Sequence, residues 1–246
     1  MNIKLIISYD GASYLGWQEG SDGPTIEKAL RQALEKVYQE PLVLQAASRT
    51  DAGVHAHGQV VNFKPTKKKD LTRLLISLNQ LLPKSIRVLS LEEVKDSFHP
   101  TLDNEGKEYH YHLHLAPVQS PFIRNFSWHI HTPINIGLMR EASSFFIGTH
   151  DFSALTNINF PKPKDTTRTL RRIDLIEESP NLRIEIEGDN FLYKMARNIV
   201  GTLVYVGMGK LTLAEARHLL TQKDRTFAGI TAPAHGLTLH TVFYRQ

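Results

Sequence analysis

The succession of two hydrophobic periodicities along the first hundred residues constrains the fold more than any other feature of this sequence. Apolar residues recur at helical spacing between residues 25 and 38, whereas Ile3–Tyr9 has the composition of a strand. The same criteria predict strands at about 42–47, 57–64 and 86–93 and a second helix at about 70–82. The order strand, helix, two strands, helix, strand is that of a split βαβ, or ferredoxin-like, unit.

The second half of the chain shows the same kinds of element without repeating the first half residue by residue. Residues 107–115 alternate as a strand does, with Tyr109, Tyr111 and Leu113 on one face and histidines on the other. A long apolar helix is expected to begin at Asn190 and to end near Gly207. Further predictions are helices at about 135–146 and 212–221, strands at about 169–177 and 182–188, and a closing strand over Leu237–Tyr244. Together these elements predict an α+β fold with mainly hairpin connections and a boundary near Gly106, between residues 1–105 and 106–246.

The composition excludes several classes of protein. The chain has 246 residues, of which 41% are hydrophobic, so it is long enough and apolar enough to bury one large or two modest cores. It has no cysteine, which excludes a disulfide framework, a thiolate nucleophile and a thiolate-held metal. No apolar run approaches the roughly 18 residues of a membrane span, and the N-terminal run is too short for a signal peptide. A cytoplasmic protein is therefore expected.

The loop Ser48–His55, between two predicted strands, is the first candidate site. It contains Arg49, Asp51 and a histidine, and loops held by a rigid sheet often carry active groups. One interpretation is purely structural, an Asx-turn in which the Asp51 side chain accepts from the Gly53 amide. The other is functional and requires a partner that keeps the carboxylate ionised and aimed. The local pattern leaves both open.

Arg197 is a candidate for that partner. It is expected to share one face of the long apolar helix with Lys194, three residues earlier. An arginine buried without a partner costs several kcal/mol, so its side chain either extends to water or forms a pair. A carboxylate is the best-matched partner, because it accepts two parallel hydrogen bonds from a guanidinium.

Histidines at alternate positions resemble a metal site. They are His55 with His57, and His110 with His112 and His114. Because a strand rises roughly 3.3 Å per residue, the outer two of the triplet stand about 13 Å apart and cannot share one ion at about 2.0–2.1 Å. We therefore expect no metal and interpret these histidines as solvated or RNA-facing, with a two-histidine site as the alternative.

Positive charge is concentrated between Pro161 and Arg172. The local net charge of +4 equals that of the whole chain, so this segment either contacts the phosphates of a nucleic acid or is a solvated loop. Its charged residues are Lys162, Lys164, Asp165, Arg168, Arg171 and Arg172.

Recognisable motifs are spread over essentially the whole chain. The most specific is the candidate loop itself, Arg49-Thr50-Asp51-Ala52-Gly53-Val54-His55-Ala56. The other stretches are Tyr9-Asp10-Gly11, Gly16-Trp17-Gln18, Ser97-Phe98-His99, Gly106-Lys107-Glu108-Tyr109-His110-Tyr111, Gly148-Thr149-His150-Asp151-Phe152, Arg168-Thr169, Phe191 to Gly201, Lys223-Asp224-Arg225 and Ala232 to Leu237. In this order and spacing they resemble the motifs of the TruA-type tRNA pseudouridine synthases.

The resemblance implies isomerisation of uridine to pseudouridine at positions 38, 39 and 40 of the tRNA anticodon stem and loop. It also implies the pseudouridine synthase fold, with two ferredoxin-like halves around a central, mainly antiparallel sheet, and a homodimer that binds tRNA. The N-terminal half would carry the catalytic loop and the C-terminal half the stacking tyrosine and the arginine helix. The reaction is redox-neutral and adds no water, so the expectation is that it needs neither cofactor nor metal.

The resemblance also implies roles for particular residues. Asp51 would be the catalytic carboxylate, Tyr109 the ring stacked on the target base, and Arg197 the charge partner of Asp51. The residues implied in substrate binding are Arg49, which handles the RNA as the nucleotide turns out, Tyr109, Arg168, and Leu237, which lines the uracil pocket.

Two other functions compete with this interpretation. One is a catalytically inert tRNA-binding module of the same fold, and the presence of Asp51, Tyr109 and Arg197 together argues against it. The other is a metal-dependent hydrolase that uses His55 and His57 or the histidine-bearing strand. The lack of a carboxylate-rich ligand set argues against the hydrolase.

Overall fold

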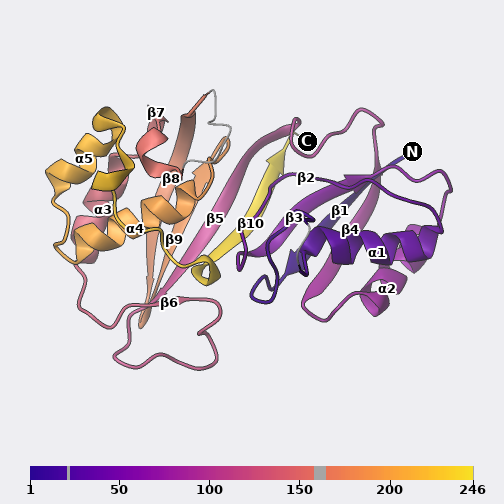
Figure 1. The fold of residues 1–246 in the computed structure, drawn as a ribbon, viewed down its shortest axis with the longest axis horizontal. Coiled ribbons are helices and arrows are strands. Elements are labelled where there is room, and N and C mark those ends of the chain that lie inside the picture. Colours follow the sequence, from indigo (N-terminus) through magenta and orange to yellow (C-terminus); the bar gives the residue numbers. More distant parts are fainter. Residues whose placement is uncertain (21–22, 158–164, 246) are drawn as a thin grey trace. The chain divides into compact units, whose positions relative to one another are not determined.

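A computed structural model describes residues 1–20, 23–157 and 165–245. The chain forms two compact units, one made of Met1–Glu105 with Thr238–Gln246 and the other of Gly106–Leu237. Figure 1 shows the helices and strands of both. None of the helices in the described ranges is long and apolar enough to cross a membrane.

The first unit is an antiparallel sheet with a parallel strand added at one edge. Its strands follow the order β4-β1-β3-β10, and β10 runs parallel to β3 through the pair Thr238↔His55. Helices α1 and α2 lie against one face of this sheet (Figure 1). The elements are β1 (Asn2–Tyr9), α1 (Ile26–Tyr38), β2 (Gln45–Ala46), β3 (His55–Phe63), α2 (Leu71–Leu81), β4 (Ile86–Val94) and β10 (Leu237–Tyr244).

Capping residues explain where the two helices of this unit begin. The Thr25 side chain accepts from the Lys28 amide at the start of α1, and the Asp70 side chain accepts from the Arg73 amide at the start of α2. The buried residues of α1 include Ile26, Leu30 and Ala33, as the helical spacing predicts.

The second unit is a fully antiparallel run of four strands in the order β5-β9-β8-β7, with the short β6 parallel to β5. Helices α3, α4 and α5 gather on one side of β8 and β9 (Figure 1). The elements are β5 (Asn104–His114), β6 (Trp128–His129), α3 (Ile136–Ser144), β7 (Gly148–Asp151), β8 (Thr167–Glu178), β9 (Asn181–Gly188), α4 (Met195–Gly207), α5 (Leu213–Gln222) and three 3₁₀ turns, Ser153–Leu155, Arg225–Phe227 and Ala234–Gly236.

The predicted α+β class with mainly antiparallel strands is confirmed, but several element boundaries were wrong. The strand expected at 42–47 is reduced to Gln45–Ala46, and the short strands β6 and β7 were not predicted. The long helix begins at Met195 rather than Asn190, because Lys194 adopts a left-handed conformation with φ 59°. The segment from Asn190 to Lys194 is therefore a connection that places its side chains differently from a helix.

Candidate active site

Main-chain contacts with residues 10–17 hold the loop Ser48–His55 in the first unit. The Trp17 amide donates to the Thr50 carbonyl oxygen at 3.0 Å. A Cβ atom on Gly11 would lie 1.9 Å from the Val54 carbonyl oxygen, and one on Gly16, whose φ is 93°, would lie 2.6 Å from that of Thr50. The glycines of the two N-terminal motifs therefore let one backbone segment support the other.

The Asx-turn interpretation of Asp51 stays a prediction. The Gly53 amide donates to the Tyr14 carbonyl oxygen at 3.2 Å, which ties this turn to the N-terminal segment. Thr50 is buried, and its hydroxyl lies 2.8 Å from that of Tyr9. Asp51 itself is half-buried and Arg49 is exposed, so the loop presents both side chains beside a fixed backbone.

Tyr109 and Phe191 form an aromatic pair in the second unit. Tyr109 lies on β5 and is buried, and its ring meets that of Phe191 edge to face, with centroids 4.9 Å apart. Phe191 precedes α4, and its amide donates to the Asn190 side-chain oxygen at 3.0 Å. The sequence placed Phe191 on a helical stripe, so this contact was missed.

Arg197 is anchored near the first turn of α4. Its Nε donates to the Ala232 carbonyl oxygen at 2.7 Å, and the Ala232 amide donates back to the Arg197 carbonyl oxygen at 3.1 Å. The Tyr111 hydroxyl donates to the Pro233 carbonyl oxygen at 2.9 Å. These bonds fix the segment that leads to buried Leu237, so the second unit brings Tyr109, Arg197 and Leu237 onto one framework of β5, α4 and residues 232–237. The pairing of Arg197 with Asp51 stays a prediction.

Lys194 does not share a helix face with Arg197 as predicted. It lies before α4, and its ammonium group sits over the Tyr193 ring, 4.8 Å from the centroid. The prediction failed because Lys194 takes a left-handed conformation, which stops the helix from extending back to it.

The basic segment divides between the two faces of β8. Lys162 and Lys164 lie outside the described residues. Arg168 and Leu170 share the face that carries buried apolar side chains, whereas Arg172 points to the other face and pairs with carboxylates there. Arg171 pairs with Glu187 at 3.3 Å. Interpreting Arg172 as a phosphate contact is therefore wrong, because its guanidinium is already surrounded by carboxylates.

The histidines of β5 are mostly buried, so the expectation that they face solvent or RNA was wrong for two of them. His110 Nε2 lies 2.8 Å from Glu108, and His114 Nδ1 lies 2.7 Å from the Asn181 side-chain oxygen. His55 is also buried and accepts from the Gly11 amide through Nδ1. Cross-strand and loop partners, which the alternating pattern does not reveal, account for this burial.

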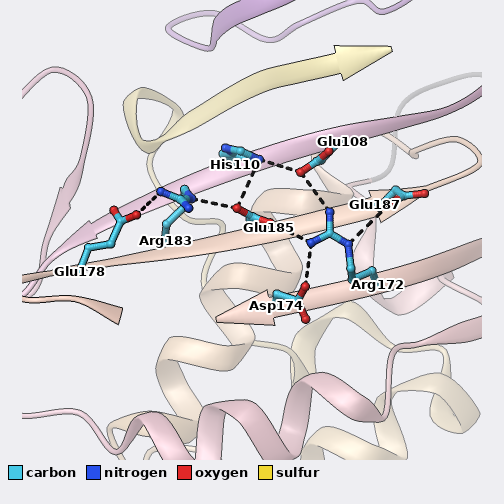
Figure 2. Close-up of polar contacts among 8 residues, drawn as sticks. All are labelled: Glu108, His110, Arg172, Asp174, Glu178, Arg183, Glu185 and Glu187. Atoms are coloured by element: carbon cyan, nitrogen blue, oxygen red, sulfur yellow. Dashed lines mark hydrogen bonds and ion pairs between the residues drawn. The ribbon is translucent and has the colours of Figure 1, made fainter. Parts of the chain in front are cut away.

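One group of side chains could hold a metal ion by distance alone. Ligand atoms of Glu108, His110 and Glu185 lie within 4.8 Å of one another. Figure 2 shows that Arg172 contacts both carboxylates and that Arg183 contacts Glu185. The Arg172 guanidinium lies 3.2 Å from Glu108 and 2.8 Å from Glu185, and that of Arg183 lies 3.0 Å from Glu185. A metal would have to displace both guanidinium groups, so this cluster is better described as an ion-pair network on the face of the sheet opposite Tyr109.

Lys107, which belongs to one of the motifs, is a site residue whose setting the sequence does not reveal. It lies two residues before Tyr109 on β5, is only 4% exposed, and its Nζ donates to the Asn190 side-chain oxygen at 2.9 Å. Burial is the main reason that the pKa of Lys107 is lowered to about 8, and the nearby charge of Arg168 lowers it further while Asp189 opposes the shift.

Comparisons with known proteins identify the family of the chain. The tRNA pseudouridine synthase family profile matches residues 5–103 and 142–245. tRNA pseudouridine synthase A 2 of Protochlamydia amoebophila (strain UWE25) is 50% identical over 248 residues, covering 99% of this chain and 94% of that protein. tRNA pseudouridine synthase A of Thermoanaerobacter sp. (strain X514) is 43% identical, covering 99% of both chains. The chain thus belongs to the TruA-type tRNA pseudouridine synthases, which are isomerases.

Proposed function

We propose that this isomerase converts uridine to pseudouridine at positions 38, 39 and 40 of the tRNA anticodon stem and loop, with Asp51 as its catalytic carboxylate. In this reaction the C1′–N1 bond breaks, the uracil turns, and C5 bonds to C1′. C5 loses a proton and N1 gains one, so atoms and electrons balance without an oxidant, a reductant or water.

The observation that carries the proposal is the way the Asp51 loop is held. The Gly53 amide donates to the Tyr14 carbonyl oxygen and the Thr50 carbonyl oxygen accepts from the Trp17 amide, so the main chain of residues 10–17 fixes the loop. A half-buried carboxylate on a loop held by its main chain is positioned to serve as nucleophile or base. Three first steps are open to Asp51: attack at C1′, attack at C6, or removal of the C2′ proton.

The second unit supports the roles proposed for the base-binding residues. Tyr109 is held edge to face by Phe191, which limits rotation of its ring and favours stacking on a base that has left the helix. Its hydroxyl is also a candidate acceptor for the C5 proton. We propose that Leu237 lines the uracil pocket and that exposed Arg49 contacts the RNA as the nucleotide turns out.

The same proposal includes the assembly and the compartment. A homodimer that binds one tRNA across both subunits is expected from the resemblance, and analytical ultracentrifugation at micromolar concentration tests it directly. A cytoplasmic location is expected because the proposed substrate is tRNA.

Release of tritium from C5-labelled uridine in unmodified tRNA tests the reaction and the role of Asp51 together. We expect release by the parent protein, unchanged by EDTA, and none by Asp51→Asn, whose amide is nearly isosteric but is neither nucleophile nor base. Thermal unfolding and tRNA affinity of the variant should match the parent. Residual release within tenfold of the parent rate would refute the role of Asp51.

The position of the product is tested by primer extension across carbodiimide-treated tRNA. Stops are expected only at positions 38, 39 and 40. Stops confined to another arm of the tRNA would retain the isomerase and overturn the anticodon assignment.

A further inference from the structure

Lys107 is a buried cation whose hydrogen-bonding capacity is only partly used. An ammonium group has three N–H donors, and among the described residues the Asn190 side-chain oxygen is its one hydrogen-bond acceptor. Its side chain is almost completely removed from water, and Arg168 brings a second positive charge near it. Such a group costs stability unless something compensates its charge.

Arg168 shows the same shortage of acceptors. Its Nε is buried and has no hydrogen-bond partner within the ranges that the structure describes. Its terminal nitrogen donates to the carbonyl oxygens of Thr167 and Asp165 and lies 3.8 Å from the Asp165 carboxylate, which is mostly exposed. Arg168 therefore has an unused, desolvated donor.

Strand register places these two cations on one face of the second unit. Lys107 pairs with Gly188 of β9, which in turn pairs with Leu170 of β8, two residues from Arg168. Because side chains alternate along a strand, Lys107, Tyr109 and Arg168 all point to the side of the buried apolar residues. Gly188 has no side chain between them, and a Cβ there would meet Leu170 at 2.7 Å.

The cations also adjoin the proposed base-stacking ring. The Asn190 oxygen that accepts from Lys107 also accepts from the Phe191 amide, and the Phe191 ring contacts Tyr109. A nucleotide whose base stacks on Tyr109 has a negatively charged phosphate on each side of its ribose. An anion placed there would take hydrogen bonds from both unused donors, and charge-assisted bonds of this kind are about twice as strong as neutral ones.

We propose that Lys107 and Arg168 form a binding site for one of the two backbone phosphates that flank the nucleotide stacked on Tyr109. The site rests on the proposed function, since it requires an RNA substrate whose target base reaches Tyr109. The cation pair holds the ribose-phosphate backbone while the base is detached and turned. Lys107 and Arg168 are thus binding residues for the reacting nucleotide.

The experiment neutralises one phosphate at a time in an anticodon stem-loop RNA. Methylphosphonate replaces the phosphate on the 5′ or the 3′ side of the target uridine, and fluorescence anisotropy gives Kd for the parent, Lys107→Met and Arg168→Met. We expect one of the two RNAs to bind the parent about tenfold more weakly. Each variant should bind the unmodified RNA about tenfold more weakly and show no further loss with that methylphosphonate.

Arg140→Gln is the matched control, because Arg140 is a surface cation of the same unit that pairs with Glu177. It should show the parent's full response to the methylphosphonate. Lys107→Arg retains the charge and should restore most of the affinity, which separates loss of charge from misfolding. Two results would overturn the phosphate site. One is that the losses of affinity caused by Lys107→Met and by the methylphosphonate multiply when the two changes are combined. The other is that neither methylphosphonate changes the affinity of the parent. Parent protein that releases no tritium from tRNA would instead refute the proposed function.

Discussion

At the scale of single residues, Asp51 and Lys107 show how differently two charged side chains can be prepared for a substrate. Asp51 stands on a loop that the main chain of residues 10–17 supports, so its position is fixed by backbone contacts. Lys107 is fixed by burial on a strand, and in the part of the chain that the structure describes only the Asn190 side-chain oxygen accepts from its ammonium group. The first arrangement positions a reactive group, whereas the second keeps a cation available for an anion from outside.

Lys107→Met should stabilise the folded protein while it weakens RNA binding. The pKa of Lys107 falls from 10.5 to about 8 on folding, so the folded state releases its proton more readily than the unfolded chain does. The destabilisation is present in full below pH 8 and disappears as the pH rises towards 10.5, and its size is on the order of 3 kcal/mol at neutral pH.

Urea unfolding of both proteins between pH 7 and 10.5 measures this effect. Lys107→Met should have the larger free energy of unfolding at pH 7, and the difference should shrink as the pH rises. A variant that is less stable than the parent at pH 7 would show that Lys107 holds the fold together, contrary to this prediction.

The sequence reveals residue types but not the partners that define these sites. The motifs pointed to Asp51, Tyr109 and Arg197 directly. The surroundings of the Lys107 ammonium group include Asn190 and Arg168. These residues lie more than 60 positions away in the sequence and approach Lys107 only when β5, β9 and β8 pair. Burial of His110 likewise depends on cross-strand neighbours rather than on the alternation of its own strand.

At the scale of elements, prediction succeeded where a periodic stripe and a cap agree and failed where a local conformation interrupts the pattern. Helices α1 and α2 have both signals, with Thr25 and Asp70 as caps. The apolar pattern of α4 extends back to Phe191, but the left-handed conformation of Lys194 makes the helix begin only at Met195. That interruption turns Phe191 towards Tyr109 and thereby builds part of the site.

The contact between the Gly16 segment and the Asp51 loop gives a prediction for an element pair. Gly16→Ala adds a methyl group 2.6 Å from the Thr50 carbonyl oxygen at a φ of 93°, so the loop must shift. We expect a loss of about 1–3 kcal/mol in the free energy of unfolding and a fall in tritium release larger than the fall in tRNA affinity.

Gly20→Ala is the control, because no atom of the described residues other than its chain neighbours lies within 4 Å of its Cβ position. Its stability and activity should match the parent. Equal activity of Gly16→Ala and Gly20→Ala would show that the loop does not need this support.

At the scale of the whole molecule, each unit supplies part of the proposed chemistry. The first carries the Asp51 loop, and the second carries Tyr109, Arg197 and the cations Lys107 and Arg168. Figure 2 shows the ion-pair network around Arg172, whose surplus of carboxylates would repel RNA. Strand register and alternation place this network on the opposite face of the second unit's sheet from Tyr109. Among the described residues, charge is thus divided between the faces of this sheet: the cations beside Tyr109 have unused hydrogen-bond donors, and the cations on the opposite face are ion-paired.

The pairing predicted between Asp51 and Arg197 is the strongest test of how the two units cooperate. Asp51 must stay ionised in a pocket dry enough to hold uracil, and Arg197 projects from an apolar helix with its Nε already bound to Ala232. Arg197→Ala should therefore lower the free energy of unfolding by roughly 3–5 kcal/mol if the pair is fully buried, because it leaves a carboxylate without its partner. It should also depress tritium release at neutral pH. Arg197→Lys retains the charge but not the planar fork, so stability should recover in part while turnover stays low.

In a double-mutant cycle that combines Arg197→Ala with Asp51→Ala, the two losses in the free energy of unfolding should be strongly non-additive. Additive losses would refute the pair and leave Arg197 as an anchor for the segment that ends at Leu237.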